Sequence, residues 1–171
     1  MRLSPPPTAL SRVQLRVLAA EVASDERLWR HLVRHEADRR TYEELLIDEP
    51  LLAGRVGLWL ICWMDDHDTG FHDHDTSAGA VAVAAGRLRE ERLAVGADPR
   101  ASVYGPGDSF DFGPSDIHRM AHAGGGPAVS IHAYSPPLQG MGAYAIEPDG
   151  VLHRTPIPYT HELRAPAPAA A

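Results

Sequence analysis

The chain has 171 residues, of which 44% are hydrophobic and 23% charged, an ordinary composition for one globular domain with a substantial core. Its formal net charge of −7 disfavours a sequence-independent nucleic-acid binder, which needs a basic face. The longest apolar run, "VGLWLICW", is too short to span a bilayer, and a single cysteine, Cys62, excludes an internal disulfide. The start of the sequence shows no secretory signal, so we expect a cytoplasmic protein that binds neither nucleic acid nor membrane.

The first part of the chain predicts helices. Residues 1–7, "MRLSPPP", are expected to form a flexible N-terminus. From about residue 8 to residue 48, apolar residues recur at three- and four-residue steps, which predicts a mostly helical segment.

The pattern changes at about residue 56. Short apolar or alternating runs follow, separated by Gly, Pro and Asp at intervals of roughly ten residues, as in antiparallel sheets that close into a sandwich or barrel. We expect this barrel to occupy residues 56–155 and to form, with the helices, a single domain over residues 8–163. Residues 164–171 are expected to be a disordered tail.

Three histidines are candidate metal ligands. In a strand, His72 and His74 of "GFHDHDTSAG" point to one face and Asp73 to the other. His118, in "FGPSDIHRM", is a candidate third ligand from a distant strand, whereas Asp75 is out of phase with the two histidines. The competing interpretation is a pair of solvated histidines in a polar turn.

A second alternating pattern lies in "SIHAY". Ser130, His132 and Tyr134 share one face, which we expect to line a pocket, while the apolar residues between them pack outward under the helices. The alternative is a strand whose polar face is solvated. A Ser-His-Asp hydrolase is disfavoured, because Ser130 lacks the glycines of a nucleophile elbow.

From Tyr42 to Tyr144 the chain resembles the thiol dioxygenases, the cysteine dioxygenase-like branch of the cupins. The resemblance lies in "GFHDHDTSAGAVAVAAG", "GPGDSFDFGPSDIHRM" and "PAVSIHAYSPP". It implies an all-β core, a jelly-roll-like cupin β-barrel with the N-terminal helices packed outside. It also implies an Fe(II) cofactor held by His72, His74 and His118.

The resemblance further implies a reaction in which both atoms of O2 are added to the sulfur of a small thiol, giving a sulfinic acid. Ser130, His132 and Tyr134 match the hydrogen-bonded Ser-His-Tyr chain beside the metal in that family. Animal members have a cysteine at the position of Gly79 that is crosslinked to the tyrosine. Glycine cannot form this bond, so Tyr134 is expected to be free.

The substrate expectation depends on Glu44. In cysteine dioxygenases, an arginine two residues after a tyrosine binds the substrate carboxylate, and an ungapped alignment on Tyr42 places Glu44 there. A carboxylate at that position favours a cationic thiol, such as cysteamine or an ergothioneine-like thiohistidine. Tyr42 and Met141 are further candidates for substrate binding, with Met141 in an apolar pocket wall. Alternatively, "TYEE" is a helix capping box, or a carboxylate is bound from a shifted position by one of three arginines, Arg39, Arg40 or Arg55.

Two other functions stay open: cysteine dioxygenase itself, and a metal-binding cupin without catalysis. Three imidazoles also suit Zn, Ni or Cu. The expected partners are the small thiol and O2, and the expected state is a monomer or weak homo-oligomer. The charged run in "GRLREERL", which includes Glu90 and Arg92, is interpreted as the solvated face of a hairpin.

Overall fold

The computed structural model describes residues 8–94, 96–148 and 150–158. The expected flexible start (1–7) and disordered tail (164–171) lie outside these ranges. The single-domain organisation over 8–163 stays a prediction.

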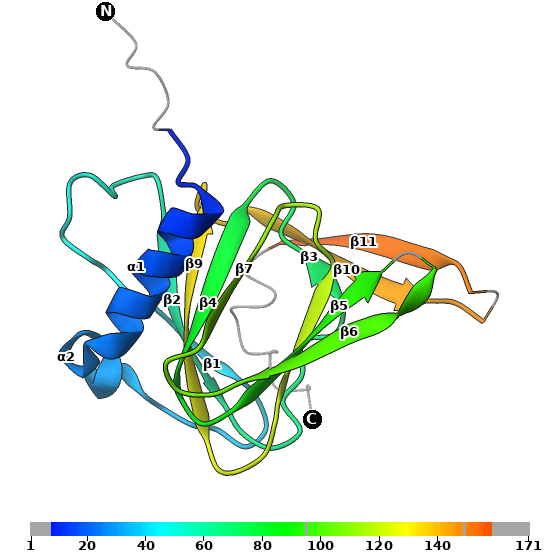
Figure 1. The fold of residues 1–171 in the computed structure, drawn as a ribbon, viewed down its shortest axis with the longest axis horizontal. Coiled ribbons are helices and arrows are strands. Elements are labelled where there is room, and N and C mark those ends of the chain that lie inside the picture. The colour runs from blue at the N-terminus through cyan, green and yellow to red at the C-terminus, as the bar shows by residue number, and fades with distance from the viewer. Residues whose placement is uncertain (1–7, 95, 149, 159–171) are drawn as a thin grey trace, which may run out of the picture.

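Two antiparallel sheets form the body of the described part of the chain, as Figure 1 shows. The five-stranded sheet contains, in spatial order, β1 (Thr41–Glu44), β2 (Gly57–Trp63), β9 (Ala128–Ser135), β4 (Ala78–Ala85) and β7 (Ser109–Phe112). The six-stranded sheet contains β11 (Leu152–Pro158), β10 (Gly140–Ile146), β3 (His72–Asp73), β8 (His118–His122), β5 (Leu88–Ala94) and β6 (Ala97–Tyr104). The predicted all-β, cupin-like core is confirmed.

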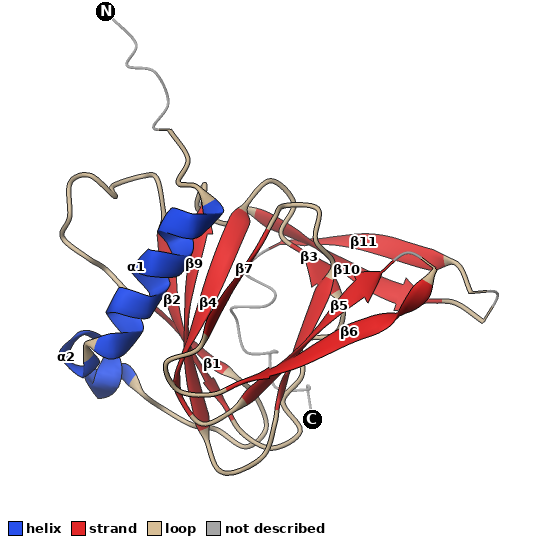
Figure 2. Cartoon of the chain, in the orientation of Figure 1, coloured by secondary structure: helices blue, strands red, loops and turns tan. Residues whose placement is uncertain are grey.

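The helices lie outside the barrel (Figure 2). Helix α1 (Arg12–Ser24) begins with a capping box of Ser11 and Gln14, and α2 (Glu26–Trp29) is followed by a 3-10 turn, η1 (Arg30–Leu32). The buried face of α1, including Leu15, packs against Ile131 and its neighbours on the outer side of the five-stranded sheet. No helix in the described part of the chain combines the length and the apolar character that crossing a bilayer requires.

The helical segment is shorter than the sequence predicts. The helices end at Leu32, and the predicted capping box is wrong because Thr41–Glu44 forms strand β1, which pairs with Trp59–Cys62 of β2. The Thr41 hydroxyl donates to the backbone oxygen of Arg34 rather than capping a helix. A β-branched and an aromatic residue in "TYEE" suit a strand, and pairing with β2 satisfies backbone groups that a local helix would otherwise satisfy.

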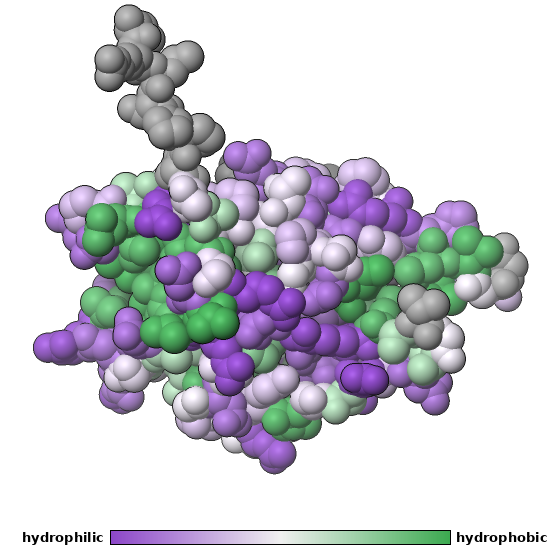
Figure 3. All heavy atoms as spheres, turned by 45° about the horizontal axis from the view of Figure 1, so that its top comes forward, coloured by the Kyte–Doolittle hydropathy of each residue, from purple (hydrophilic) through white to green (hydrophobic). Residues whose placement is uncertain are grey.

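Strand alternation divides the apolar residues into two clusters. Ile131 and Ala133 of β9 belong to the outer cluster under α1, whereas Trp63 and Phe112 belong to a second cluster that lines the inside of the barrel. On the face in Figure 3, hydrophobic side chains gather at two ends with a hydrophilic band between them. The functional site lies in the inner cluster.

Candidate metal centre

The three predicted ligands lie together inside the barrel. His72 belongs to β3, His74 follows that strand directly, and His118 begins β8 as the register partner of His72. One possible ligand atom from each ring lies within 4.8 Å of the others. All three side chains are buried. Pairing of β3 with β8 therefore brings together imidazoles that are more than 40 residues apart in the chain.

The hydrogen bonds of the rings leave nitrogen atoms for a metal. Nδ1 of His72 lies 3.0 Å from the backbone oxygen of Gly70, and Nδ1 of His118 lies 2.8 Å from Oε1 of Glu90. Within the described residues, Nδ1 of His74 and Nε2 of His118 are buried and have no hydrogen-bond partner. Buried polar atoms are normally paired. These orphaned nitrogens, in a cluster of three imidazoles, fit a transition-metal ion.

The electrostatics keep the rings of His74 and His118 neutral. Burial, and then the proximity of the other imidazoles, lowers the pKa of His74 and of His118 well below the ordinary value for histidine. A metal binds the neutral imidazole, so this environment suits ligation.

Asp73 points away from the metal cluster, as alternation predicts. Its carboxylate accepts hydrogen bonds from Nε of Arg154 at 2.7 Å and from the Tyr144 hydroxyl at 2.6 Å, which connects β3 to β10 and β11. Burial acts to raise the pKa of Asp73, but these hydrogen bonds outweigh it and lower the pKa. A Cβ atom at Gly142 would overlap with the Arg154 guanidinium. Glycine at this position therefore leaves the space through which the Arg154 side chain reaches Asp73.

The Ser-His-Tyr chain is formed on β9. Oγ of Ser130 lies 2.8 Å from Nε2 of His132, and Nδ1 of His132 lies 3.1 Å from the hydroxyl of Tyr134. Nε1 of Trp63 donates to Ser130 Oγ at 2.9 Å, a contact that the sequence does not reveal. Burial is the main cause that lowers the pKa of His132 to about 3, with His72 and Arg40 contributing. This histidine is therefore neutral at physiological pH.

A small cavity of about 30 Å³ joins the two groups of residues. Its wall includes the three clustered histidines, together with His132 and Tyr134. Two of the predicted substrate-binding residues, Tyr42 and Met141, also line it, and both side chains belong to the inner apolar cluster.

Glu44, the third predicted substrate-binding residue, does not line this cavity. It is exposed at the end of β1, opposite Trp59, and lines surface depressions with apolar residues of the following loop. The structure does not bring it to the histidines.

Among the three alternative arginines, only Arg40 lies beside the cavity wall. Its guanidinium carbon is 5.4 Å from the Trp63 ring centroid, and its Nε donates to the Tyr42 hydroxyl at 2.5 Å. Arg39 pairs with Glu36. The third, Arg55, donates to backbone oxygens of Thr8 and Leu51.

Glu90 is a residue that the sequence interpretation missed. It is only 3% exposed, so the prediction of a solvated hairpin face is wrong at this position. The signal that could have placed it is the alternation along β5, where Leu88 and Glu90 share a face and Leu88 is fully buried.

Gly79 lies opposite Tyr134 in the pairing of β4 with β9. A Cβ atom at this position would overlap with the Phe112 ring and would lie 3.1 Å from Cδ1 of Tyr134. Phe112 thus occupies the space beside Tyr134 that a side chain at position 79 would need.

Comparisons with known proteins show the family of this chain. The family model described as "Cysteine dioxygenase type I" matches residues 10–147. The chain belongs to the cysteine dioxygenase type I family. It is 32% identical over 112 residues to cysteine dioxygenase type 1 of Danio rerio, covering 60% of this chain and 55% of that protein. The Homo sapiens protein is 25% identical over 118 residues, covering 63% of this chain and 57% of its own length. The chain thus spans little more than half the length of these family members.

Solved structures support the fold. The protein TT1209 from Thermus thermophilus aligns with a TM-score of 0.53 and 13% identity, covering 63% of this chain and 93% of that one. A cupin superfamily protein from Desulfitobacterium hafniense aligns with a TM-score of 0.50 and 14% identity, covering 63% and 87%. At such low identity, the likeness concerns the cupin architecture alone.

Proposed function

We propose that this chain is a non-haem Fe(II) thiol dioxygenase, which converts a small thiol and O2 into a sulfinic acid. The reaction RSH + O2 → RSO2H balances without an added reductant, because both oxygen atoms stay on sulfur. The observation that carries the proposal is one buried cavity lined by both the three-histidine cluster and the hydroxyl end of the Ser-His-Tyr chain. Membership of the cysteine dioxygenase type I family supports it.

His72, His74 and His118 would hold the metal. Fe(II) bound to three neutral imidazoles supplies Lewis acidity toward a thiol and one-electron chemistry toward O2. The apolar side chains around the cavity, such as Ile61 and Leu138, limit the access of bulk water.

The hydrogen bonds on β9 give the Tyr134 hydroxyl a direction. An indole N–H can only donate, so Trp63 donates to Ser130 Oγ, and the same hydroxyl forms a hydrogen bond with Nε2 of His132. The other ring nitrogen of His132, Nδ1, forms a hydrogen bond with the Tyr134 hydroxyl and so orients it. The Tyr134 hydroxyl borders the cavity, where it can stabilise negative charge that develops on oxygen or sulfur.

We infer a carboxylate-bearing thiol, cysteine first, as the substrate. Arg40 lies against Tyr42 and Trp63 of the cavity wall, where a guanidinium suits a carboxylate. The relatives named above are cysteine dioxygenases. Glu44, on which the expectation of a cationic thiol depended, is exposed outside the cavity, so cysteamine and ergothioneine-like thiols become the second candidates.

The test is O2 consumption and sulfinate formation by the Fe(II)-loaded protein with cysteine, cysteamine and ergothioneine. We expect turnover of cysteine, and an increase in its KM of about tenfold or more in Arg40→Gln, because a charge-assisted hydrogen bond is lost. Arg39→Gln is the matched control, since Arg39 pairs with Glu36. Turnover of cysteamine or ergothioneine without cysteine would restore the cationic substrate, and bound iron without turnover of any thiol would favour a non-catalytic cupin.

A further inference from the structure

Strand β5 places a carboxylate beside one of the clustered histidines. Strands β5 and β8 pair with Arg92 opposite His118 and Glu90 opposite Met120. The Glu90 side chain therefore reaches His118 diagonally across the sheet, and its Oε1 lies 2.8 Å from Nδ1 of that ring. Both side chains are almost completely buried, at 3% and 1% exposure.

The Glu90 carboxylate also accepts hydrogen bonds from two other side chains. Nε of Arg92 donates to Oε1 at 2.9 Å, and the Tyr104 hydroxyl donates to Oε2 at 3.4 Å. Burial raises the pKa of Glu90, and Arg92 acts in the opposite direction. A buried carboxylate is tolerated when it is paired in this way.

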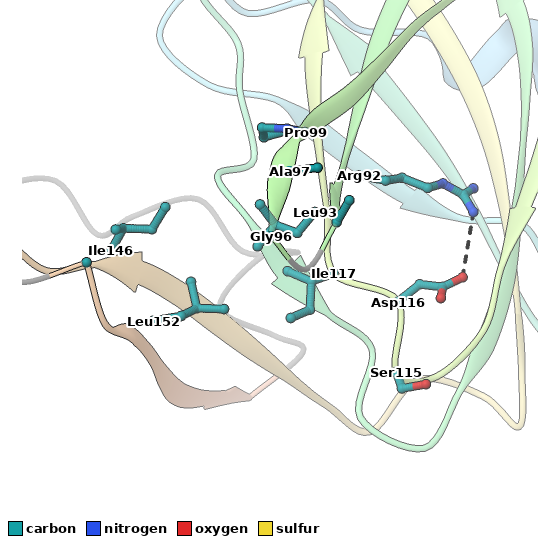
Figure 4. A pocket seen from close by; sticks show the side chains of 12 residues that line it. Arg92, Leu93, Gly96, Ala97, Pro99, Ser115, Asp116, Ile117, Ile146 and Leu152 are labelled. Carbon is teal, nitrogen blue, oxygen red and sulfur yellow. Dashed lines mark ion pairs between the residues drawn. The ribbon is translucent and has the colours of Figure 1, made fainter.

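Arg92 is itself fixed at its outer end. Its Nη2 donates to the backbone oxygen of Asp111 at 2.5 Å, and its Nη1 lies 3.6 Å from Oδ2 of Asp116. Its guanidinium carbon lies 5.9 Å from the Phe110 ring centroid. Figure 4 shows the Arg92–Asp116 ion pair among the residues that line a surface cavity of about 590 Å³. A continuous row of charged groups thus leads from the surface to a histidine of the metal cluster.

We propose that Glu90 is a positioning residue for the metal ligand His118. By accepting the Nδ1 proton, it fixes the neutral tautomer whose Nε2 lone pair is available to the metal, and it also fixes the orientation of the ring. Nε2 of His118 is a buried nitrogen that has no partner among the described residues, as this role requires. The inference rests on the metal centre of the proposed function and does not depend on which thiol reacts.

The contact behind His118 also differs from the one behind His72. Nδ1 of His72 faces a backbone carbonyl, that of Gly70, whereas Nδ1 of His118 faces the carboxyl group of a side chain. A carboxylate behind an imidazole raises its basicity as a ligand. Glu90 therefore strengthens metal binding as well as orienting the ring.

The first test uses the wild-type protein without metal. Long-range ¹H–¹⁵N NMR correlations distinguish the two neutral tautomers of a histidine. We expect His118 to carry its proton on Nδ1 at neutral pH. A proton on Nε2 would overturn the proposal, whatever the activity of the protein.

The second test compares Glu90→Gln with Glu91→Gln, a matched control from the same strand. Glu91 is the next residue along β5, and its carboxylate pairs with Arg89 at 2.7 Å. In competition with a chromogenic chelator under anaerobic conditions, Glu90→Gln should bind Fe(II) roughly ten- to a hundredfold more weakly than wild type. Its Co(II) form should show a changed absorption spectrum, while Glu91→Gln behaves as wild type.

Equal Fe(II) affinity and equal Co(II) spectra in Glu90→Gln and wild type would refute the positioning role. If the wild-type protein binds no metal, the metal centre of the proposed function is refuted. That outcome is distinct from refutation of the positioning role alone. If Glu90→Gln does not fold, the tautomer measurement on the wild type decides.

Discussion

Single residues in "HDH" have separate functions because successive side chains of a strand point in opposite directions. His72 and His74 point to the cavity, while Asp73 between them accepts hydrogen bonds from Arg154 and Tyr144 on the other side of the sheet. The same alternation on β9 separates the Ser-His-Tyr chain from Ile131, which packs under α1.

Removal of the Tyr134 hydroxyl tests the residue at the end of this chain. Tyr134→Phe deletes the donor that His132 orients and keeps the ring that contacts His74. We expect kcat/KM for the thiol to fall by about a hundredfold, the usual effect of losing a donor aimed at developing charge. Iron content should stay at the wild-type level. Sulfinate formation and metal analysis on the same preparation measure both quantities, and an unchanged kcat/KM would contradict the role of the hydroxyl.

Elements differ in how well the sequence predicts them. The faces of β9 follow from alternation within eight consecutive residues, so both the polar and the apolar set could be predicted. Thr41–Glu44 could not be predicted as a strand, because its conformation depends on pairing with β2. That strand follows in the chain after a loop of more than ten residues. Local pattern carries no information about such a partner.

The metal cluster, too, could be predicted only in part from local sequence pattern. His72 and His74 could be placed on one face from their spacing. The residues made His118 only a candidate third ligand, which the resemblance supported, since no local pattern shows that β8 pairs with β3. The burial of Glu90 depends on Arg92 and Tyr104, which bring opposite charge and a hydroxyl from the same sheet. Charged residues are mostly exposed, so composition alone favoured the wrong interpretation.

The contact between β4 and β7 predicts an effect at Gly79. A methyl group there would overlap with the Phe112 ring, which is fully buried. We expect Gly79→Ala to lower the free energy of unfolding by about 1–3 kcal/mol, as overpacking does. Gly105→Ala is the control, because the nearest atom, Oδ2 of Asp108, would lie 3.9 Å from its Cβ. Urea denaturation measures both changes, and equal stability of the two variants would show that Phe112 moves aside without cost.

The loop before β3 is connected to β8 by an ion pair that predicts a pH effect. Burial tends to raise the pKa of Asp68, but hydrogen bonds from Arg119 and the Gly70 amide outweigh it and hold the pKa below its ordinary value of 3.8. Because the folded-state pKa is depressed, this carboxylate stabilises the fold above pH 3.8, and the contribution is lost as pH falls through the folded-state pKa.

Asp68→Asn should therefore be less stable than wild type at pH 7, by about 1 kcal/mol or less for a partly exposed pair. The difference should shrink as the pH falls below 3.8. Asp66→Asn removes the same charge from an exposed position of the same loop and should show no such trend. Chemical denaturation of the metal-free proteins over this pH range is the measurement, and a difference that does not depend on pH would contradict the ion-pair explanation.

For the whole molecule, the proposed metal centre would join segments that are far apart in the chain, since its three histidines lie in β3, directly after β3 and in β8. A ligand that binds only the folded state adds about 2.7 kcal/mol of stability at a free concentration of 100 Kd. For a protein of this size we expect Fe(II) or Co(II) to raise Tm by roughly 5–10 °C. Thermal unfolding under anaerobic conditions, with and without a chelator, measures the shift.

His118→Gln should abolish the metal-induced change in Tm. His122→Gln removes another imidazole from β8, at a position outside the cluster, and should keep the change. An equal response in both variants would mean that the metal binds elsewhere.

Among the residues that the structure describes, the outermost strands of the six-stranded sheet both carry proline. Pro99 lies in β6 at one margin, and Pro156 and Pro158 lie in β11 at the other. Proline has no amide hydrogen to offer to an incoming chain, and Arg100 beside Pro99 adds charge. These residues disfavour pairing between the edge of this sheet and an edge strand of a second molecule. They therefore protect the protein against fibrous aggregation at high concentration.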